Sequence, residues 1–106
     1  MLKSEHEIQN EIRVALSENG CKVFRINVVS GQTKDGRYIT TGVPKGFPDL
    51  CGYRIRDGKM FFVEVKTPTG KLRPDQIKFR EAVKNDPVIH VVARSAEQAV
   101  KEVLNR

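Results

Sequence analysis

The spacing of apolar residues along the chain first predicts an N-terminal helix over residues 4–19. Ile8, Ile12 and Leu16 recur every four positions, which is the spacing of one face of an α-helix. Ser4 stands just before this pattern, where a serine side chain can cap the first turn. The segment is therefore expected to bury one apolar stripe against the rest of the fold.

Short apolar runs bounded by turn residues predict four strands, over residues 21–29, 50–55, 60–65 and 88–93. The first three are expected to form an antiparallel meander. The last run is almost entirely β-branched, which is typical of a strand buried on both faces. We expect it to join the sheet in parallel with residues 60–65 through a right-handed crossover, with His90 as a satisfied core histidine.

Two further helices are predicted, over residues 74–84 and 96–105, and both begin at favourable residues, a proline in the first turn and a serine N-cap. In the first of them Gln76 belongs to the stripe that faces the sheet. The elements therefore follow in the order αβββαβα. The predicted fold is an α/β domain, a small mixed β-sheet flanked by helices, that spans residues 1–106 as a single unit.

The pair Asp57-Gly58 between two apolar runs predicts a β-hairpin, because both residue types tolerate the positive φ that a tight turn requires. If these two residues form the turn, counting outward places Asp49 opposite Lys66. Asp49 and Glu64 then become diagonal neighbours on the face that also carries Lys66. The hairpin is expected to bring two acids and a lysine together.

Two carboxylates buried together need compensation, either from the lysine or from a bound cation. Oxygen ligands that leave room for water and a phosphate suit Mg²⁺, with Mn²⁺ as a substitute. Lys66, one pleat away from Glu64, could hold the attacking water or neutralise charge at the phosphorus atom. Alternatively, Glu64 and Lys66 form a solvated pair and Asp49 is a turn residue. The position of these charges at the end of the apolar run Met-Phe-Phe-Val favours a site that hydrolyses phosphodiesters.

The same residues carry a resemblance to a known group of enzymes. Pro48-Asp49, followed by Glu64-Val65-Lys66 at the end of the next strand, resembles the signature of the PD-(D/E)xK nuclease superfamily. The glutamate-rich N-terminal helix and residues 46–50 and 71–76 resemble its VRR-NUC branch, the virus-type replication and repair nucleases. The resemblance runs over nearly the whole chain and implies a restriction-endonuclease-like core with the element order predicted above.

The resemblance also implies a role for individual residues. Asp49 and Glu64 would be metal ligands, with the backbone carbonyl of Val65 as the third. Lys66 would be the catalytic lysine. Cleavage would leave a 5′-phosphate.

Two further site residues are implied outside the hairpin. The family places a metal-proximal glutamate on its first helix, which by spacing is Glu5, with Glu7 as the runner-up. It also gives Gln76 a role beside the lysine, orienting substrate or water. The alternatives are ordinary helix chemistry, since acids in a first turn complement the helix dipole and polar residues are common there.

Residues 30–46 are predicted to be one long irregular loop, punctuated by glycines and basic in character. We expect it to cover the hairpin and touch the nucleic-acid backbone, or else to serve as a dimerisation arm. Gly46 could allow close approach of a phosphate. Arg25 could approach a phosphate or simply belong to the polar face of an edge strand. The candidate nucleic-acid-binding residues are Arg25, Lys34, Arg37, Tyr38, Lys45, Lys71 and Arg73.

Composition narrows the class of protein. A net charge of +6 and a pI near 9.6 favour a polyanionic partner. A chain of 106 residues has no room for a separate recognition domain. Cys21 and Cys51 suggest free thiols in a reducing compartment. Without an apolar run long enough for a membrane helix, we expect a cytoplasmic protein without membrane partners, whether of viral or cellular origin.

Together these features predict a Mg²⁺-dependent, structure-selective DNA endonuclease that acts as a homodimer on Holliday junctions or other branched DNA. Two alternatives stay open. The chain could be a non-catalytic nucleic-acid-binding module that retains the nuclease fold, although an intact Asp, Glu and Lys set argues against it. It could also be a sequence-specific restriction-type endonuclease, which the lack of an appended recognition domain disfavours.

Overall fold

The computed structural model describes residues 2–27, 30–40 and 42–106. In these ranges the elements are α1 (Glu5–Glu18), β1 (Cys21–Arg25), β2 (Ser30–Gln32), β3 (Tyr38–Thr40), β4 (Leu50–Arg54), β5 (Met60–Val65), α2 (Pro74–Val83), β6 (Ile89–Ala93) and α3 (Ala96–Leu104). None of the described helices has the length and apolar character needed to cross a membrane.

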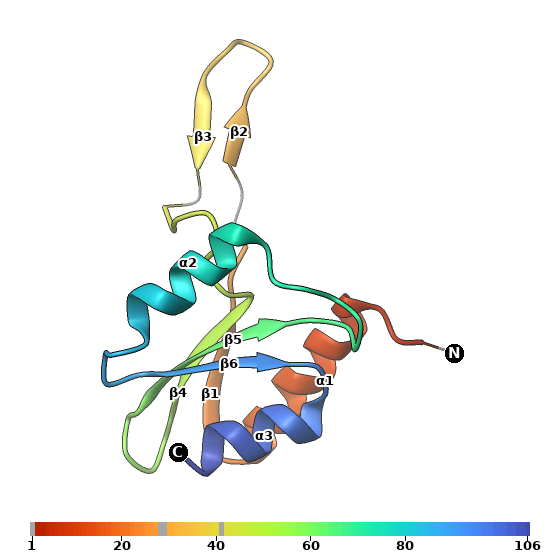
Figure 1. Ribbon diagram of the computed structural model, residues 1–106, viewed down its shortest axis with the longest axis vertical. Helices are drawn as coiled ribbons and strands as arrows, with labels where there is room; N and C mark the ends of the chain where they lie inside the picture. The colour runs from red at the N-terminus through yellow and green to blue at the C-terminus, as the bar shows by residue number, and fades with distance from the viewer. Residues whose placement is uncertain (1, 28–29, 41) are drawn as a thin grey trace.

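Four of the strands form the central sheet, in the order β1-β4-β5-β6. β1, β4 and β5 pair antiparallel, and β6 lies parallel to β5. Helices α1 and α3 cover one face of this sheet and α2 lies on the other (Figure 1). The predicted mixed α/β fold is confirmed.

The core lies between the sheet and the α1–α3 pair. Helix α1 buries its predicted stripe, and Ser4 caps it by accepting a hydrogen bond from the backbone N–H of Glu7 at 3.1 Å. Ser95 caps α3 in the same way. The buried residues that meet in this core include Ile8, Ile12, Leu16, Leu50, Phe61, Val63, Val65, Ala99 and Val103.

Three phenylalanines attach α2 to the opposite face. The rings of Phe47, Phe62 and Phe79 contact one another edge-on, with centroids 5.1–5.6 Å apart. Phe47 stands two residues before Asp49, Phe62 two before Glu64 and Phe79 three after Gln76. Because such aromatic contacts have preferred geometries, this cluster fixes the three segments that carry site residues relative to one another.

The hairpin of β4 and β5 has a different register from the predicted one. Tyr53 pairs with Met60, and the backbone N–H of Arg54 donates to the carbonyl of Lys59 at 3.0 Å, so the loop consists of residues 55–58. The buried Arg54 side chain binds the carboxylate of Asp57 at 2.6 Å, which folds that residue back over the loop. The predicted two-residue turn was therefore wrong.

The correction amounts to a shift of two residues and changes no face, because side chains alternate with a period of two. Leu50 pairs with Val63, and the same register continued by one residue places Asp49 directly opposite Glu64. The two acids are therefore cross-strand partners and not diagonal neighbours.

Residues 30–46 do not form one irregular loop, so the predicted long loop was wrong. β2 and β3 form a hairpin that projects from the body of the protein and does not cover the β4–β5 hairpin (Figure 1). A three-residue loop with Gly36 at φ 88° closes it. The signal was Asp35-Gly36, the same kind of pair as Asp57-Gly58, but its immediate neighbours, Lys34 and Arg37, are not apolar.

Two strands also depart from their predicted form. β1 ends at Arg25, and residues 28 and 29 of the predicted strand lie outside the described residues. β6 alternates buried with half-buried residues, so only its α1–α3 face is fully covered. His90 is half-buried and, within the described structure, its Nδ1 has no hydrogen-bond partner, so it is not the satisfied core histidine expected; burial lowers its pKa to about 4.

Candidate active site

The centre of the site is a pair of carboxylates where β4 begins and β5 ends. Asp49 directly precedes β4, and its Oδ2 accepts a hydrogen bond from the backbone N–H of Val65 at 2.9 Å. Glu64 belongs to β5 and is 1% exposed. The side chain of Asp49 thus reaches across to the strand that carries Glu64, and the predicted convergence of the two acids is observed.

Gln76 fixes the orientation of Glu64. Its Nε2 donates to Glu64 Oε1 at 2.9 Å, while its Oε1 accepts from the backbone N–H of Arg73 at 2.8 Å. The amide oxygen is thus committed to a backbone donor, so the amide nitrogen must be the group that faces the carboxylate. Gln76 lies in the first turn of α2 and is 4% exposed, as the sequence predicted for a residue that faces the sheet.

The electrostatics of the pair favour a bound cation or proton. Burial, followed by the neighbouring Asp49 carboxylate, raises the pKa of Glu64 to about 9, and the positive charges of Lys66 and Arg73 only partly oppose this. Without a metal, Glu64 therefore keeps a proton at neutral pH.

The donor set fits a hard divalent ion. Glu64 Oε2 is buried and accepts no hydrogen bond from any described residue, which leaves a carboxylate oxygen available beside Asp49. Oxygen donors of this kind suit Mg²⁺ or Mn²⁺, which keep several of their waters. The role of the Val65 carbonyl as a third ligand stays a prediction.

Lys66 stands immediately after β5, on the same side of the strand as Glu64. Its side chain is 5% exposed, and it forms no ion pair with the residues that the structure describes. Its positive charge nevertheless acts on Glu64, whose pKa it lowers. The lysine is therefore close to the pair without being neutralised by direct contact.

Arg94 pins the turn beside Lys66. Its guanidinium donates to the carbonyls of Thr67 at 2.5 Å and Gly70 at 2.7 Å, which are the two ends of that turn. A Cβ built on Gly70 would lie 3.6 Å from Lys66 Cδ, so the turn packs along the lysine stem. Sequence reasoning did not single out Arg94, because nothing local shows that a residue after β6 reaches this turn.

Gly46 links the loop before Asp49 to α2. It adopts φ 90°, and a Cβ at this position would lie 2.3 Å from the backbone oxygen of Asp75. The close approach that the glycine permits is therefore to the first turn of α2, next to Gln76. The predicted approach of a phosphate to Gly46 is untested.

The acids of helix α1 do not join the pair. Glu5 is exposed, and Glu7 is engaged in the capping box with Ser4. In the described part of the chain no three His, Cys, Asp or Glu side chains gather in a way that could hold a metal. The inward residue near this end of α1 is Gln9, 9% exposed, whose Oε1 has no described partner. A role for Glu5 stays a prediction.

All seven predicted nucleic-acid-binding residues are exposed. Two of them pair with acids: Arg37 with Asp35 at 3.0 Å, and Arg73 with Asp75 at 3.3 Å. Of the other basic residues, Arg25, Lys34, Lys45 and Lys71 form no ion pair with a described residue. Tyr38 is uncharged.

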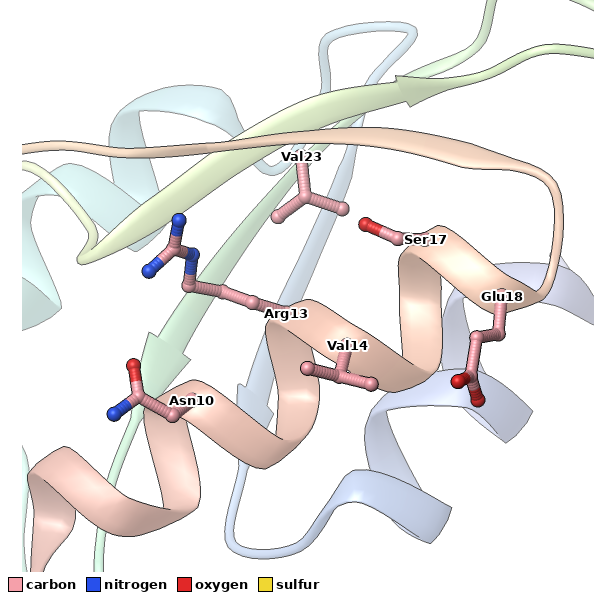
Figure 2. Close-up of a pocket in the computed structure, with 6 residues that line it drawn as sticks. All are labelled: Asn10, Arg13, Val14, Ser17, Glu18 and Val23. Carbon is pink, nitrogen blue, oxygen red and sulfur yellow. The ribbon is translucent and has the colours of Figure 1, made fainter.

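Two other features lie apart from the pair. A hollow of about 410 Å³ between α1 and β1 contains none of the predicted site residues; it is lined by Asn10, Arg13, Val14, Ser17, Glu18 and Val23 (Figure 2). Cys21 is buried and Cys51 half-buried, both as free thiols. Burial raises the pKa of both, so neither has the thiolate character of a nucleophile.

Comparison with known proteins agrees with this geometry. The family model described as the VRR-NUC domain matches residues 4–97, which include the pair, Lys66 and Gln76. A solved structure titled VRR_NUC domain is 25% identical, with 95% of each chain covered and a TM-score of 0.64. Among curated proteins, none matches. The motif resemblance is thus confirmed over most of the chain, which belongs to the VRR-NUC domain family.

Proposed function

We propose that this protein is a metal-dependent endonuclease that hydrolyses phosphodiester bonds in DNA. The observation that carries the proposal is the Asp49–Glu64 pair, in which Glu64 is buried and Asp49 half-buried, with Lys66 on the same side of β5. Two adjacent carboxylates with a nearby lysine match the needs of phosphate-ester hydrolysis, in which negative charge must be both bound and neutralised. Membership of the family supplies the nuclease-type fold.

Each residue of the site has a distinct task in this proposal. A divalent ion, held by Asp49, Glu64 and the Val65 carbonyl, would supply positive charge at the phosphate and acidify a water. Lys66 neutralises charge that develops on the phosphate oxygens and positions the attacking water. Gln76 holds Glu64 in place, as a partner behind a metal ligand does. Glu5 stays a candidate for tuning the site once substrate is bound.

The preferred substrate in this proposal is branched DNA, cut by a homodimer. A domain of 106 residues offers little surface for recognising a long site, and a two-fold pair would place two equivalent sites on one four-way junction. Sedimentation at working concentrations tests the assembly. A monomer under those conditions would contradict the two-site version and leave the single-site nuclease standing.

The function itself is tested on a panel of linear, nicked, flap and four-way DNA with Mg²⁺ or Mn²⁺. We expect cleavage by the wild type, fastest on the branched substrates, and none by Asp49→Ala or Lys66→Ala, although both variants should still bind DNA. Binding without cleavage by the wild type would instead favour a non-catalytic module. Sequence-dependent cutting of linear duplex would favour the restriction-type alternative.

A further inference from the structure

The arm formed by β2 and β3, residues 30–40, stands apart from the body. Its two strands have three residues each, and none of the core residues that the structure describes comes from it (Figure 1). A two-stranded hairpin is only marginally stable by itself in water. An arm that supplies no described core residue is better explained by a partner outside the monomer.

Local hydrogen bonds and an ion pair connect the residues at the tip of the arm. The backbone N–H of Thr33 donates to the carbonyl of Arg37 at 2.7 Å, and that of Gly36 donates to Thr33 at 3.0 Å. The guanidinium of Arg37 pairs with Asp35 at 3.0 Å. The turn is thus shaped before any partner arrives, which reduces the entropy lost on binding.

Charge identifies the kind of partner. The arm, residues 30–40, has two basic residues and one acid, a net charge of +1, and Arg25 and Lys45 flank it in the sequence with two more positive charges. The single acid is Asp35, which Arg37 neutralises. Lys34 is exposed with no ion pair among the described residues, and Tyr38 is 69% exposed. This is a surface for a polyanion with groups to contact sugars and bases.

The position of the arm connects it with the carboxylate pair. Where the chain leaves the sheet towards the arm, the backbone N–H of Ile26 donates to the carbonyl of Asp49 at 2.8 Å. The chain returns from the arm through Gly46 and Phe47 to the same Asp49. A phosphate bound at the pair therefore places the flanking duplex next to the base of the arm.

The dimensions of a β-ribbon suit one groove of that duplex. From the Ser30–Thr40 pair to Asp35 at the tip is five residues, or about 17 Å of extended chain. The major groove of B-DNA is about 8.5 Å deep and about 12 Å wide and admits a two-stranded ribbon, whereas that of an RNA duplex is too narrow.

We propose that the β2–β3 arm enters the major groove of the DNA duplex that flanks the cleaved bond, where Lys34 contacts a phosphate and Tyr38 contacts base edges or sugar. This inference rests on the proposed function, since it takes DNA as the substrate. It assigns to the arm a role in recognising the DNA.

The test measures binding of a fluorescent duplex by anisotropy, without divalent metal so that no DNA is cut. Lys34→Gln should weaken binding several-fold in 0.1 M salt and make the slope of log K against log salt about one smaller. Lys101→Gln, which removes an exposed charge from α3, is the matched control and should change neither quantity. Tyr38→Ala should weaken binding without changing the slope, and Tyr38→Phe should restore much of it.

The groove is tested with modified DNA. Glucosylated hydroxymethylcytosine, whose sugars fill the major groove, should weaken the wild type to the level of Tyr38→Ala, whereas a minor-groove ligand such as netropsin should have little effect. The reverse pattern, or binding unchanged by both Lys34→Gln and Tyr38→Ala, would overturn the proposal. So would a wild-type dimer that Tyr38→Ala splits in the absence of DNA, because the arm's partner would then be a second copy of the chain.

The arm and the nuclease can fail separately. Metal-dependent cleavage by the wild type but not by Asp49→Ala establishes the nuclease whatever the arm variants do. Conversely, binding that depends on Lys34 and Tyr38 in a protein that cuts nothing would support the arm and refute the enzyme.

Discussion

Gln76 Nε2 donates a hydrogen bond of 2.9 Å to Glu64 Oε1, so a residue of α2 holds a carboxylate of β5. The Oε1 of the same side chain accepts a hydrogen bond from the backbone N–H of Arg73, at the start of its own helix. One residue therefore joins helix capping to the orientation of the site. A change at this position should affect stability and activity together.

Gln76→Ala should lower cleavage by roughly ten- to a hundredfold, because the support behind a metal ligand is lost. Gln98 provides a matched control, since it also stands three residues after an N-cap and its Oε1 accepts from the backbone N–H of Arg94 at 2.8 Å. Its Nε2 donates to the Val92 carbonyl and not to a carboxylate. Gln98→Ala should cost a similar amount of stability in urea unfolding yet lose much less activity than Gln76→Ala; equal activity losses would contradict the role of Gln76.

Glu64 should make the metal-free protein less stable as the pH rises. Its pKa is about 9 in the folded state against an ordinary value of 4.5. Between these values the unfolded chain releases a proton that the folded chain retains, so the stability contribution is full below pH 4.5 and is lost progressively towards pH 9.

Glu64→Gln tests this pH dependence, because the amide imitates the protonated acid: Oε1 can still accept from Gln76 and Nε2 can face Asp49. Without metal the variant should be more stable than the wild type at pH 8, by an amount on the order of 5 kcal/mol, and equal to it near pH 4. Urea unfolding at several pH values gives both numbers. Glu18→Gln, at an exposed end of α1, should follow the wild-type curve; a Glu64→Gln curve parallel to the wild type would contradict the raised pKa.

Gly46→Ala should be more harmful than an ordinary glycine substitution. The new Cβ would lie 2.3 Å from the Asp75 backbone oxygen, in addition to the strain of φ 90°. We expect a loss of about 2 to 4 kcal/mol, together with slower cleavage as the first turn of α2 moves Gln76.

Gly20→Ala separates strain from collision. Gly20 has φ 81°, and a Cβ there meets nothing within 4 Å. This control should lose only about 1 kcal/mol and cleave normally. Thermal unfolding and initial cleavage rates measure both variants, and equal losses would show that contact with α2 is unimportant.

The alternation of side chains explains why the shared face of Asp49, Glu64 and Lys66 could be predicted although the hairpin register was wrong. The predicted register differs from the observed one by two residues, and an even shift returns Asp49, Glu64 and Lys66 to the same face. Their convergence depends on whether the register shift is even or odd and on where the strands end. It does not depend on the turn.

Long-range side-chain contacts account for what the sequence did not reveal. The loop before β5 has four residues because Arg54, 4% exposed, binds Asp57 and also donates to the carbonyl of Val103 in α3 at 3.0 Å. No local pattern marks an arginine inside an apolar strand as a tertiary anchor. The strands of the β2–β3 arm were not predicted for another reason. The arm supplies no described core residue, so its sequence lacks the apolar alternation by which strands are predicted.

Cleavage in the presence of Mg²⁺ by the wild type, Glu64→Gln and the control Glu18→Gln, followed on one end-labelled branched DNA under single-turnover conditions, tests the central claim most directly. The Asp49–Glu64 site predicts that the wild type and Glu18→Gln cut at the same rate, that Glu64→Gln is slower by roughly a thousandfold, and that EDTA abolishes cleavage by all three. Cleavage by Glu64→Gln at the wild-type rate would contradict the assignment of this carboxylate pair as the catalytic centre.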